Sequence, residues 1–104
     1  MEIKKLSIII PCFNEGPTIY KILDKIKAVS LLNSIEKEII IVNDCSTDNT
    51  AQSVYGYIEN NALLNIVFIQ HEKNKGKGTA IHTGIKVASG DVIIIQDADL
   101  EYDP

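Results

Sequence analysis

Four carboxylates alternate near the end of the chain, directly after a run of apolar residues: Asp97, Asp99, Glu101 and Asp103. In an extended segment, residues two apart face the same side, so these side chains would project together. Clustered carboxylates repel one another and their pKa values rise unless a cation lies among them. Oxygen ligands suit a hard divalent ion, Mg2+ or Mn2+, which commonly shares a few carboxylates with substrate phosphates. We therefore expect a metal site here, with an acidic segment that holds no ion as the alternative.

A basic stretch with two glycines occupies residues 72–79. Gly76 and Gly78 suggest the dinucleotide pattern GxGxxG, but residue 81 is isoleucine and the stretch follows the third apolar run instead of the first. The phosphate-loop pattern GxxxxGK[ST] is absent from the chain. Near a helix N-terminus, the lysines could meet an anionic group or could simply be solvated; they are Lys73, Lys75 and Lys77.

Single polar or aromatic residues follow the first two apolar runs. Asp44 could accept a hydrogen bond from a base N–H or a ribose hydroxyl. Glu15 could serve a ligand or the dipole of the next helix, and Phe13 could stack on a base or pack against the protein. His71 and His82 have no partner visible in the sequence, so we interpret both as uninformative about function.

Four short β-branched runs must position these residues. They occupy residues 8–10, 39–42, 66–69 and 92–95, and their starts are 31, 27 and 26 residues apart. Continuous apolar runs are typical of parallel strands buried on both faces, and the spacing leaves room for a helix between successive strands. Right-handed crossovers would then bring the loops that follow the strands to the carboxyl edge of one sheet, where open α/β folds bind ligands.

The segments between the runs carry helical periodicity. We expect helices over residues 19–29, behind Gly16 and Pro17 as cap and first turn, and over 51–58, behind the N-cap candidates of 46–48. A third helix is expected over 81–88, ending at Gly90. The prediction is a single domain over residues 1–104, of class α/β, with a Rossmann-like parallel sheet (β-α-β-α-β-α-β, order 3-2-1-4) and helices on both faces.

Composition excludes several classes of protein. Ten Lys+Arg against fourteen Asp+Glu give a net charge of −4, so a nucleic acid is not an expected partner. No apolar stretch approaches the roughly 18 residues of a membrane helix, so we expect no membrane contact from this segment and a cytoplasmic location. Cys12 and Cys45 match no metal spacing and are expected to be reduced and inert.

Four segments together resemble the family 2 inverting glycosyltransferases of the GT-A fold, over residues 6–104. They are IIIPCFNE at 8–15, IVNDCSTDNT at 41–50, NKGKG at 74–78 and DAD at 97–99. Each is weak alone, but the four occur in the family's order and spacing. The sequence DADL is most similar to the dolichyl-phosphate mannose synthase and polyprenyl-phosphate glucosyltransferase branch.

The resemblance implies a site for a UDP- or GDP-sugar donor. Base, ribose and sugar would be held by Pro11, Phe13, Glu15, Val42, Asp44, Asp97 and Ala98. The divalent cation that bridges the diphosphate would be held by Asp97, Asp99 and Glu101. The cation would stabilise the departing nucleoside diphosphate as the acceptor displaces it. The acceptor would be a polyprenyl phosphate or a growing polysaccharide, as in cell-wall or polysaccharide biosynthesis.

The chain departs from the family pattern at several places. Asn43 replaces a frequent aspartate, Glu101 replaces a glutamine, and Cys45 replaces a usual glycine, which would strain a turn that needs positive φ. Family members continue well beyond the metal motif, so we expect a fragment whose catalytic base lies downstream of Pro104 and which alone is inactive. The fourth strand would then present an unpaired edge through which copies of the chain could self-associate.

Other classes of function remain open at this point. The chain could be a non-catalytic module that binds nucleotide and metal. A receiver-like phosphoacceptor domain would need an aspartate after the third strand, where this chain has Gln70, His71 and Glu72. Nucleotidyltransferases of similar fold carry their glycine-rich signature near the first strand, where this chain reads CFNE at residues 12–15.

Overall fold

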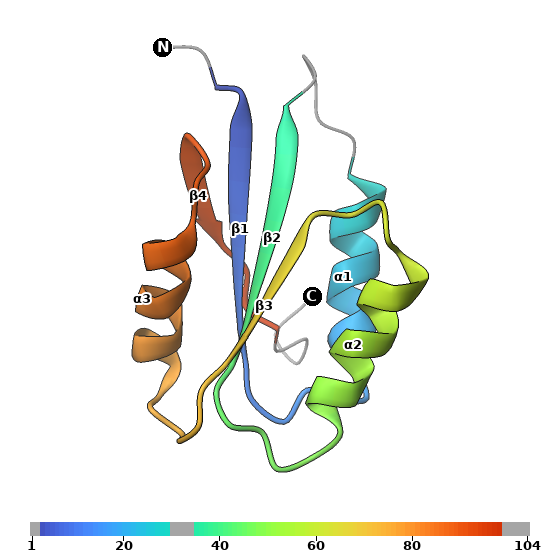
Figure 1. Ribbon diagram of the computed structural model, residues 1–104, viewed down its shortest axis with the longest axis vertical. Helices are drawn as coiled ribbons and strands as arrows, with labels where there is room; N and C mark the ends of the chain where they lie inside the picture. Colours follow the sequence, from blue (N-terminus) through green and yellow to red (C-terminus); the bar gives the residue numbers. More distant parts are fainter. Residues whose placement is uncertain (1–2, 30–34, 99–104) are drawn as a thin grey trace.

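A parallel sheet of four strands organises the molecule (Figure 1). The computed structural model describes residues 3–29 and 35–98. Along the chain the elements are β1 (Lys5–Cys12), α1 (Ile19–Ala28), β2 (Glu36–Asn43), α2 (Thr50–Asn60), β3 (Ile66–Gln70), α3 (Lys77–Val87) and β4 (Val92–Ile95). The strand order is β3-β2-β1-β4 and every pairing is parallel. The predicted fold class and strand order are confirmed.

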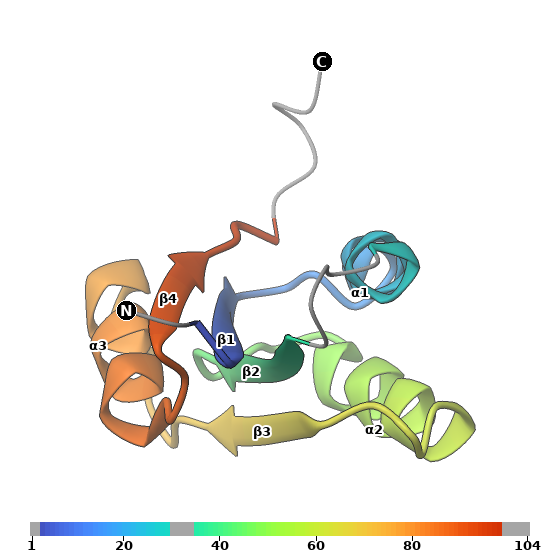
Figure 2. The same ribbon diagram turned by 90° about the horizontal axis from the view of Figure 1, so that it is seen from above.

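Helices cover both faces of the sheet, as predicted (Figure 2). Alternate residues of β1 and β2 enter the core on the side of α1 and α2, together with the apolar stripe of α1: Ile8, Ile10, Cys12, Ile39, Ile41, Ile19, Ile22, Leu23 and Ile26. The intervening residues Ile9, Ile40 and Val42 pack against Ala80 of α3 on the other face. Burial on both faces explains why the central strands are continuously apolar.

Gly84 allows α3 to lie directly on β1. A Cβ placed at this position would come 2.6 Å from Cγ2 of Ile9, a side chain that is itself fully buried. We expect Gly84→Ala to lower the free energy of unfolding by about 2 kcal/mol, because the close-packed core must shift to admit the methyl group. Gly56→Ala in α2 is the control, since its Cβ would meet nothing within 4 Å and should stabilise the helix by about 1 kcal/mol. Urea unfolding of both variants measures the difference, and equal effects would contradict this account of the packing.

A buried carboxylate ties the α3–β4 connection to the amino ends of β1 and β2. Glu38 accepts hydrogen bonds from Ser7 Oγ (2.8 Å), Ser89 N–H (3.0 Å) and Ser89 Oγ (2.9 Å), and Lys5 Nζ lies 3.4 Å away. Burial raises the pKa of Glu38, but these hydrogen bonds outweigh it and bring the pKa down to about 2. Gly90 follows this loop, and its backbone approaches so closely that a Cβ would lie 2.6 Å from Ser7 Oγ.

The first helix begins at Ile19, as predicted, but its N-cap is Thr18 and not Gly16, because the residues after Glu15 form a turn in which the N–H groups of Thr18 and Ile19 both donate to the Glu15 carbonyl. The other two helices differ from the expectation at their ends. The second begins at Thr50, whose N–H donates to the Asp48 carboxylate. The third ends at Val87, so Gly90 is required by the close approach to β1 and is not a helix cap.

The last strand forms one edge of the sheet and is poorly covered. Ile93, Ile94 and Ile95 are 40–46% exposed, whereas the isoleucines of β1 and β2 are buried. An exposed edge at the fourth strand was predicted and is present in the described part of the chain. Within the same ranges, no helix combines the length and the apolar character needed to cross a membrane.

Candidate functional site

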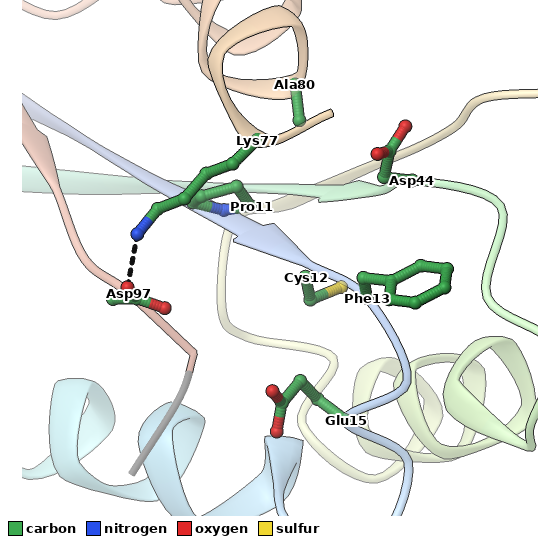
Figure 3. Close-up of a pocket in the computed structure, with 8 residues that line it drawn as sticks. All are labelled: Pro11, Cys12, Phe13, Glu15, Asp44, Lys77, Ala80 and Asp97. Carbon is green, nitrogen blue, oxygen red and sulfur yellow. Dashed lines mark hydrogen bonds and ion pairs between the residues drawn. The ribbon is translucent and has the colours of Figure 1, made fainter. Parts of the chain in front are cut away.

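The loops that follow β1, β2 and β3 and the segment that follows β4 meet at the carboxyl edge of the sheet (Figure 1). They surround a pocket of about 230 Å³ (Figure 3). Its lining residues are Pro11, Cys12, Phe13, Glu15, Asp44, Lys77, Ala80 and Asp97. Segments far apart in the sequence therefore contribute to a single pocket at the edge where open α/β folds place their ligands.

Most of the described residues that the sequence assigned to a donor site reach this pocket. Pro11, Phe13, Glu15, Asp44 and Asp97 line it. Val42 and Ala98 do not, because both are buried in the core, on opposite faces of the sheet. A part in nucleotide binding for those two stays a prediction. The expected metal ligands Asp99 and Glu101, and Asp103, lie outside the described residues.

Asp44 has three hydrogen-bonding partners among the described residues. Its Oδ1 accepts the Lys75 N–H (2.8 Å) and faces His71 Nδ1 at 2.9 Å, while its Oδ2 accepts the Gly76 N–H (2.8 Å). Burial raises the pKa of Asp44, but the hydrogen bonds from His71 and from the two backbone groups outweigh it, so the pKa lies below its usual value. The carboxylate therefore fixes the loop before α3, including Gly76 at φ 93°.

His71 was judged uninformative from the sequence, and that interpretation was wrong. Its side chain is only 7% exposed, and it bridges Asp44 to Thr83 of α3, whose Oγ1 lies 2.9 Å from Nε2. Because the Asp44 carboxylate is an acceptor, the network assigns a proton to Nδ1. The strand register could have revealed the pair. Asn43 of β2 lies opposite Gln70 of β3, so the residues that come next, Asp44 and His71, also lie close to each other.

The loops after β1 and β2 interlock through short polar side chains. Asn14 has φ 54°, and its Oδ1 accepts the N–H groups of Thr47 (2.8 Å) and Asp48 (3.3 Å). Asp48 in turn accepts the Gly16 N–H at 3.1 Å. Cys45 has φ 58°, so the positive φ expected where the family has glycine is present. These contacts fix the loop that carries Phe13 and Glu15 against the loop that follows Asp44.

An ion pair between Lys77 and Asp97 joins the start of α3 to the segment after β4 (Figure 3). Both side chains are about half exposed, at 57% and 48%. An exposed pair of this kind contributes at most about 1 kcal/mol to stability, so a charged ligand could separate it at little cost. The pocket thus offers a cation and a carboxylate side by side.

The thiol of Cys12, which lines the pocket, is expected to be unreactive. Cys12 is buried, and burial, together with the nearby carboxylates of Glu15, Asp48 and Asp44, raises its pKa to about 12. Such a thiol stays protonated near neutral pH and is a poor nucleophile. Both Cys12 and Cys45 are free, consistent with the expectation of reduced cysteines.

Of the three expected metal ligands, only Asp97 lies in the described part of the chain. Over residues 3–29 and 35–98, no three side chains of His, Cys, Asp or Glu gather closely enough to hold a metal ion. Asp97 offers carboxylate oxygens at the pocket, which is the donor type that Mg2+ and Mn2+ prefer.

Comparison with known sequences identifies a family. The model of "Glycosyl transferase family 2" matches residues 7–104. Poly-beta-1,6-N-acetyl-D-glucosamine synthase of Staphylococcus aureus is 39% identical over 102 residues, which are 98% of this chain and 23% of that protein. The Staphylococcus epidermidis synthase is 37% identical over the same share. The chain therefore spans about a quarter of the length of these curated relatives.

Solved structures share both the fold and part of the sequence. A mannosyltransferase from Pyrobaculum calidifontis, in complex with GDP-Man and Mn2+, aligns over 95% of this chain and 28% of its own, with a TM-score of 0.86 and 28% identity. TarS 1-349 of S. aureus, in complex with UDP-GlcNAc, aligns over 91% of this chain and 26% of its own, with a TM-score of 0.79 and 31% identity.

Proposed function

Because the chain belongs to glycosyl transferase family 2, we propose that its pocket binds the nucleoside diphosphate of a sugar donor. In the longer protein, the sugar would pass to an acceptor with inversion at the anomeric carbon. The observation that carries the proposal is the convergence of Phe13, Asp44, Lys77 and Asp97 on one pocket at the carboxyl edge. The complexes of the mannosyltransferase with GDP-Man and of TarS with UDP-GlcNAc support a UDP- or GDP-sugar as donor.

Each end of the pocket offers different chemistry. Asp44 supplies acceptor oxygens and Phe13 an aromatic ring, which suit a base and a ribose. Lys77 supplies a cation that would pair with a phosphate, and Asp97, with Asp99 and Glu101, would hold Mg2+ or Mn2+. The bound cation would stabilise the charge that develops on the leaving diphosphate.

The acceptor is proposed to be a growing polysaccharide or a polyprenyl phosphate. The similarity to poly-beta-1,6-N-acetyl-D-glucosamine synthase supports the first of these. A receiver-like phosphoacceptor is disfavoured because β3 ends at Gln70 and is followed by the buried His71, with no aspartate there.

Calorimetric titration of UDP, GDP and their sugar conjugates tests the donor site. With Mn2+ we expect saturable binding that EDTA abolishes, because the cation screens the diphosphate from Asp97. Asp97→Asn and Asp99→Asn should each weaken binding roughly tenfold or more. Glu59→Gln, a change of equal charge on an exposed residue of α2, is the matched control and should change nothing. Binding that is insensitive to both EDTA and the aspartate variants would contradict the proposal.

A non-catalytic module would bind the same nucleotide and metal and would differ from the proposed enzyme only in that it does not consume the sugar donor. Release of free sugar from the donor, or its transfer to an acceptor, by the purified 104-residue chain would show catalysis within the chain. Donor binding without turnover would favour a module whose transfer activity belongs to the longer protein.

We further propose that the exposed edge of β4 lets copies of the chain associate. Ile93, Ile94 and Ile95 present apolar side chains beside the unpaired backbone of an edge strand, a combination that favours pairing between chains. Sedimentation velocity should show a concentration-dependent dimer that Ile94→Lys removes. Ile85→Lys, at an exposed position of α3, is the control and should leave the dimer in place. A monomer at all concentrations would contradict this.

A further inference from the structure

We propose that His71 is a positioning residue of the donor site, which holds helix α3 in a fixed relation to Asp44 although its own side chain does not line the pocket. The inference rests on the proposed function and adds to it a residue that acts on the ligand only through others. It predicts that nucleotide affinity depends on a buried polar bridge behind two walls of the pocket.

The ring of His71 connects elements that lie far apart in the sequence. Nδ1 lies 2.9 Å from Oδ1 of Asp44, which follows β2, and Nε2 lies 2.9 Å from Oγ1 of Thr83 in α3. The side chains of His71 and Asp44 are both almost fully buried. Breaking either contact would leave a nearly buried polar atom without a partner, which is unfavourable, so the ring is held at both ends.

Two anchors fix the beginning of α3. The Asp44 carboxylate accepts the N–H of Gly76, the residue just before the helix, and His71 holds Thr83 further along it. Both anchors lead back to Asp44, one directly and one through His71. Lys77 and Ala80 lie between the anchors in the sequence, and both line the pocket (Figure 3). The bridge therefore fixes the wall that α3 supplies relative to the wall that Asp44 supplies.

The packing of α3 on the sheet leaves this restraint to the polar bridge. The buried residues of the helix are Ala80 and Gly84, which face the core side chains of the sheet, Ile9 among them. Such small residues let the helix approach the sheet closely, but they make few contacts that would oppose sliding along it. A directional hydrogen bond to Thr83 opposes that movement, because it is lost when the helix shifts by a fraction of its length.

Two single variants remove the same bridge and should have the same effect. His71→Asn keeps an N–H near the position of Nδ1, toward Asp44, but is too short to reach Thr83. Thr83→Val keeps the shape of the side chain and removes the hydroxyl. In calorimetric titrations with UDP and with GDP, each with Mn2+, we expect either variant to weaken binding of the nucleotide that the wild type prefers by about tenfold.

The double variant and a matched control show whether the effect belongs to the bridge. His71→Asn combined with Thr83→Val should bind no more weakly than either single variant, since both changes remove one interaction. His82→Asn, at an exposed position of the same helix, is the control and should bind as the wild type does.

Urea unfolding separates positioning from stability. A residue with a purely structural role would lower the free energy of unfolding and leave the affinity of the folded chain unchanged. The titrations are therefore made where circular dichroism shows each variant to be folded. If His71→Asn does not fold, Thr83→Val alone decides, because it keeps the shape of the replaced side chain.

Failure of this inference is distinguishable from failure of the proposed function. Wild-type affinity in the folded single variants, or losses that add in the double variant, would overturn the positioning role of His71 and leave the donor site standing. If the folded wild-type chain binds neither UDP nor GDP, the proposed function and this inference are overturned together.

Discussion

Asp44→Ala is expected to lower the free energy of unfolding by about 3 kcal/mol and to abolish nucleotide binding. The substitution leaves the N–H groups of Lys75 and Gly76 and the Nδ1 of His71 without their common acceptor. Each of these partly buried donors left unpaired is unfavourable by up to about 1–3 kcal/mol, and by less where water can enter. Urea unfolding followed by circular dichroism measures the first effect, and calorimetry with UDP measures the second.

Asp44→Asn separates the two effects. The amide keeps one acceptor oxygen for the loop, so it should destabilise the fold less than alanine does. It also replaces acceptor capacity with an NH2 group, so UDP binding should still fall. An alanine variant within 0.5 kcal/mol of the wild type would show that the loop before α3 does not depend on Asp44.

The second large effect concerns pH and arises at the opposite end of the sheet. The folded-state pKa of Glu38 is about 2, below the usual glutamate value of 4.5, so the ionised form stabilises the fold. This contribution is fully present above about pH 4.5 and is lost as the pH falls toward about 2, and it amounts to about 3 kcal/mol. We expect the free energy of unfolding to decline through that window as Glu38 becomes protonated.

Glu38→Gln isolates this contribution from those of other carboxyl groups. Asp44 and Asp48 also have lowered pKa values, so the wild-type curve will contain their acid-induced losses too. The variant should be less stable at pH 7 and should approach the wild type as the pH falls toward 2. Parallel curves for the two proteins across pH 2–5 would exclude a special role for Glu38.

The fold could be predicted from the sequence because the apolar pattern encodes it directly. Continuous β-branched runs such as Ile39–Val42 occur in strands buried on both faces, and β2 is such a strand. Helix ends were less predictable. The start of α1 at Ile19 was predicted, but the turn after Glu15 makes Thr18 its N-cap instead of Gly16. That turn depends on hydrogen bonds between interlocking loops, which local propensity does not contain.

A site residue could be predicted only where an acidic or aromatic residue comes just after the end of a predicted strand. Asp44, Phe13 and Asp97 each follow a strand, and all three line the pocket. His71 was missed because its meaning depends on a partner 27 residues away, brought close by the β2–β3 register. Ala98 lies between two predicted ligands in sequence, but its side chain packs in the core. The family is confirmed, whereas the branch suggested by DADL stays a prediction.

The central claim is that the carboxyl edge of this sheet holds a nucleoside diphosphate together with a divalent cation. Paramagnetic broadening of backbone amide signals by substoichiometric Mn2+, with and without UDP, tests it most directly. We predict that, with UDP present, broadening centres on the amides of Phe13, Lys77 and Asp97 and spares Glu38 and Ser89 at the far end of the sheet. Broadening that is unchanged by UDP, or that centres away from the pocket, would contradict the account.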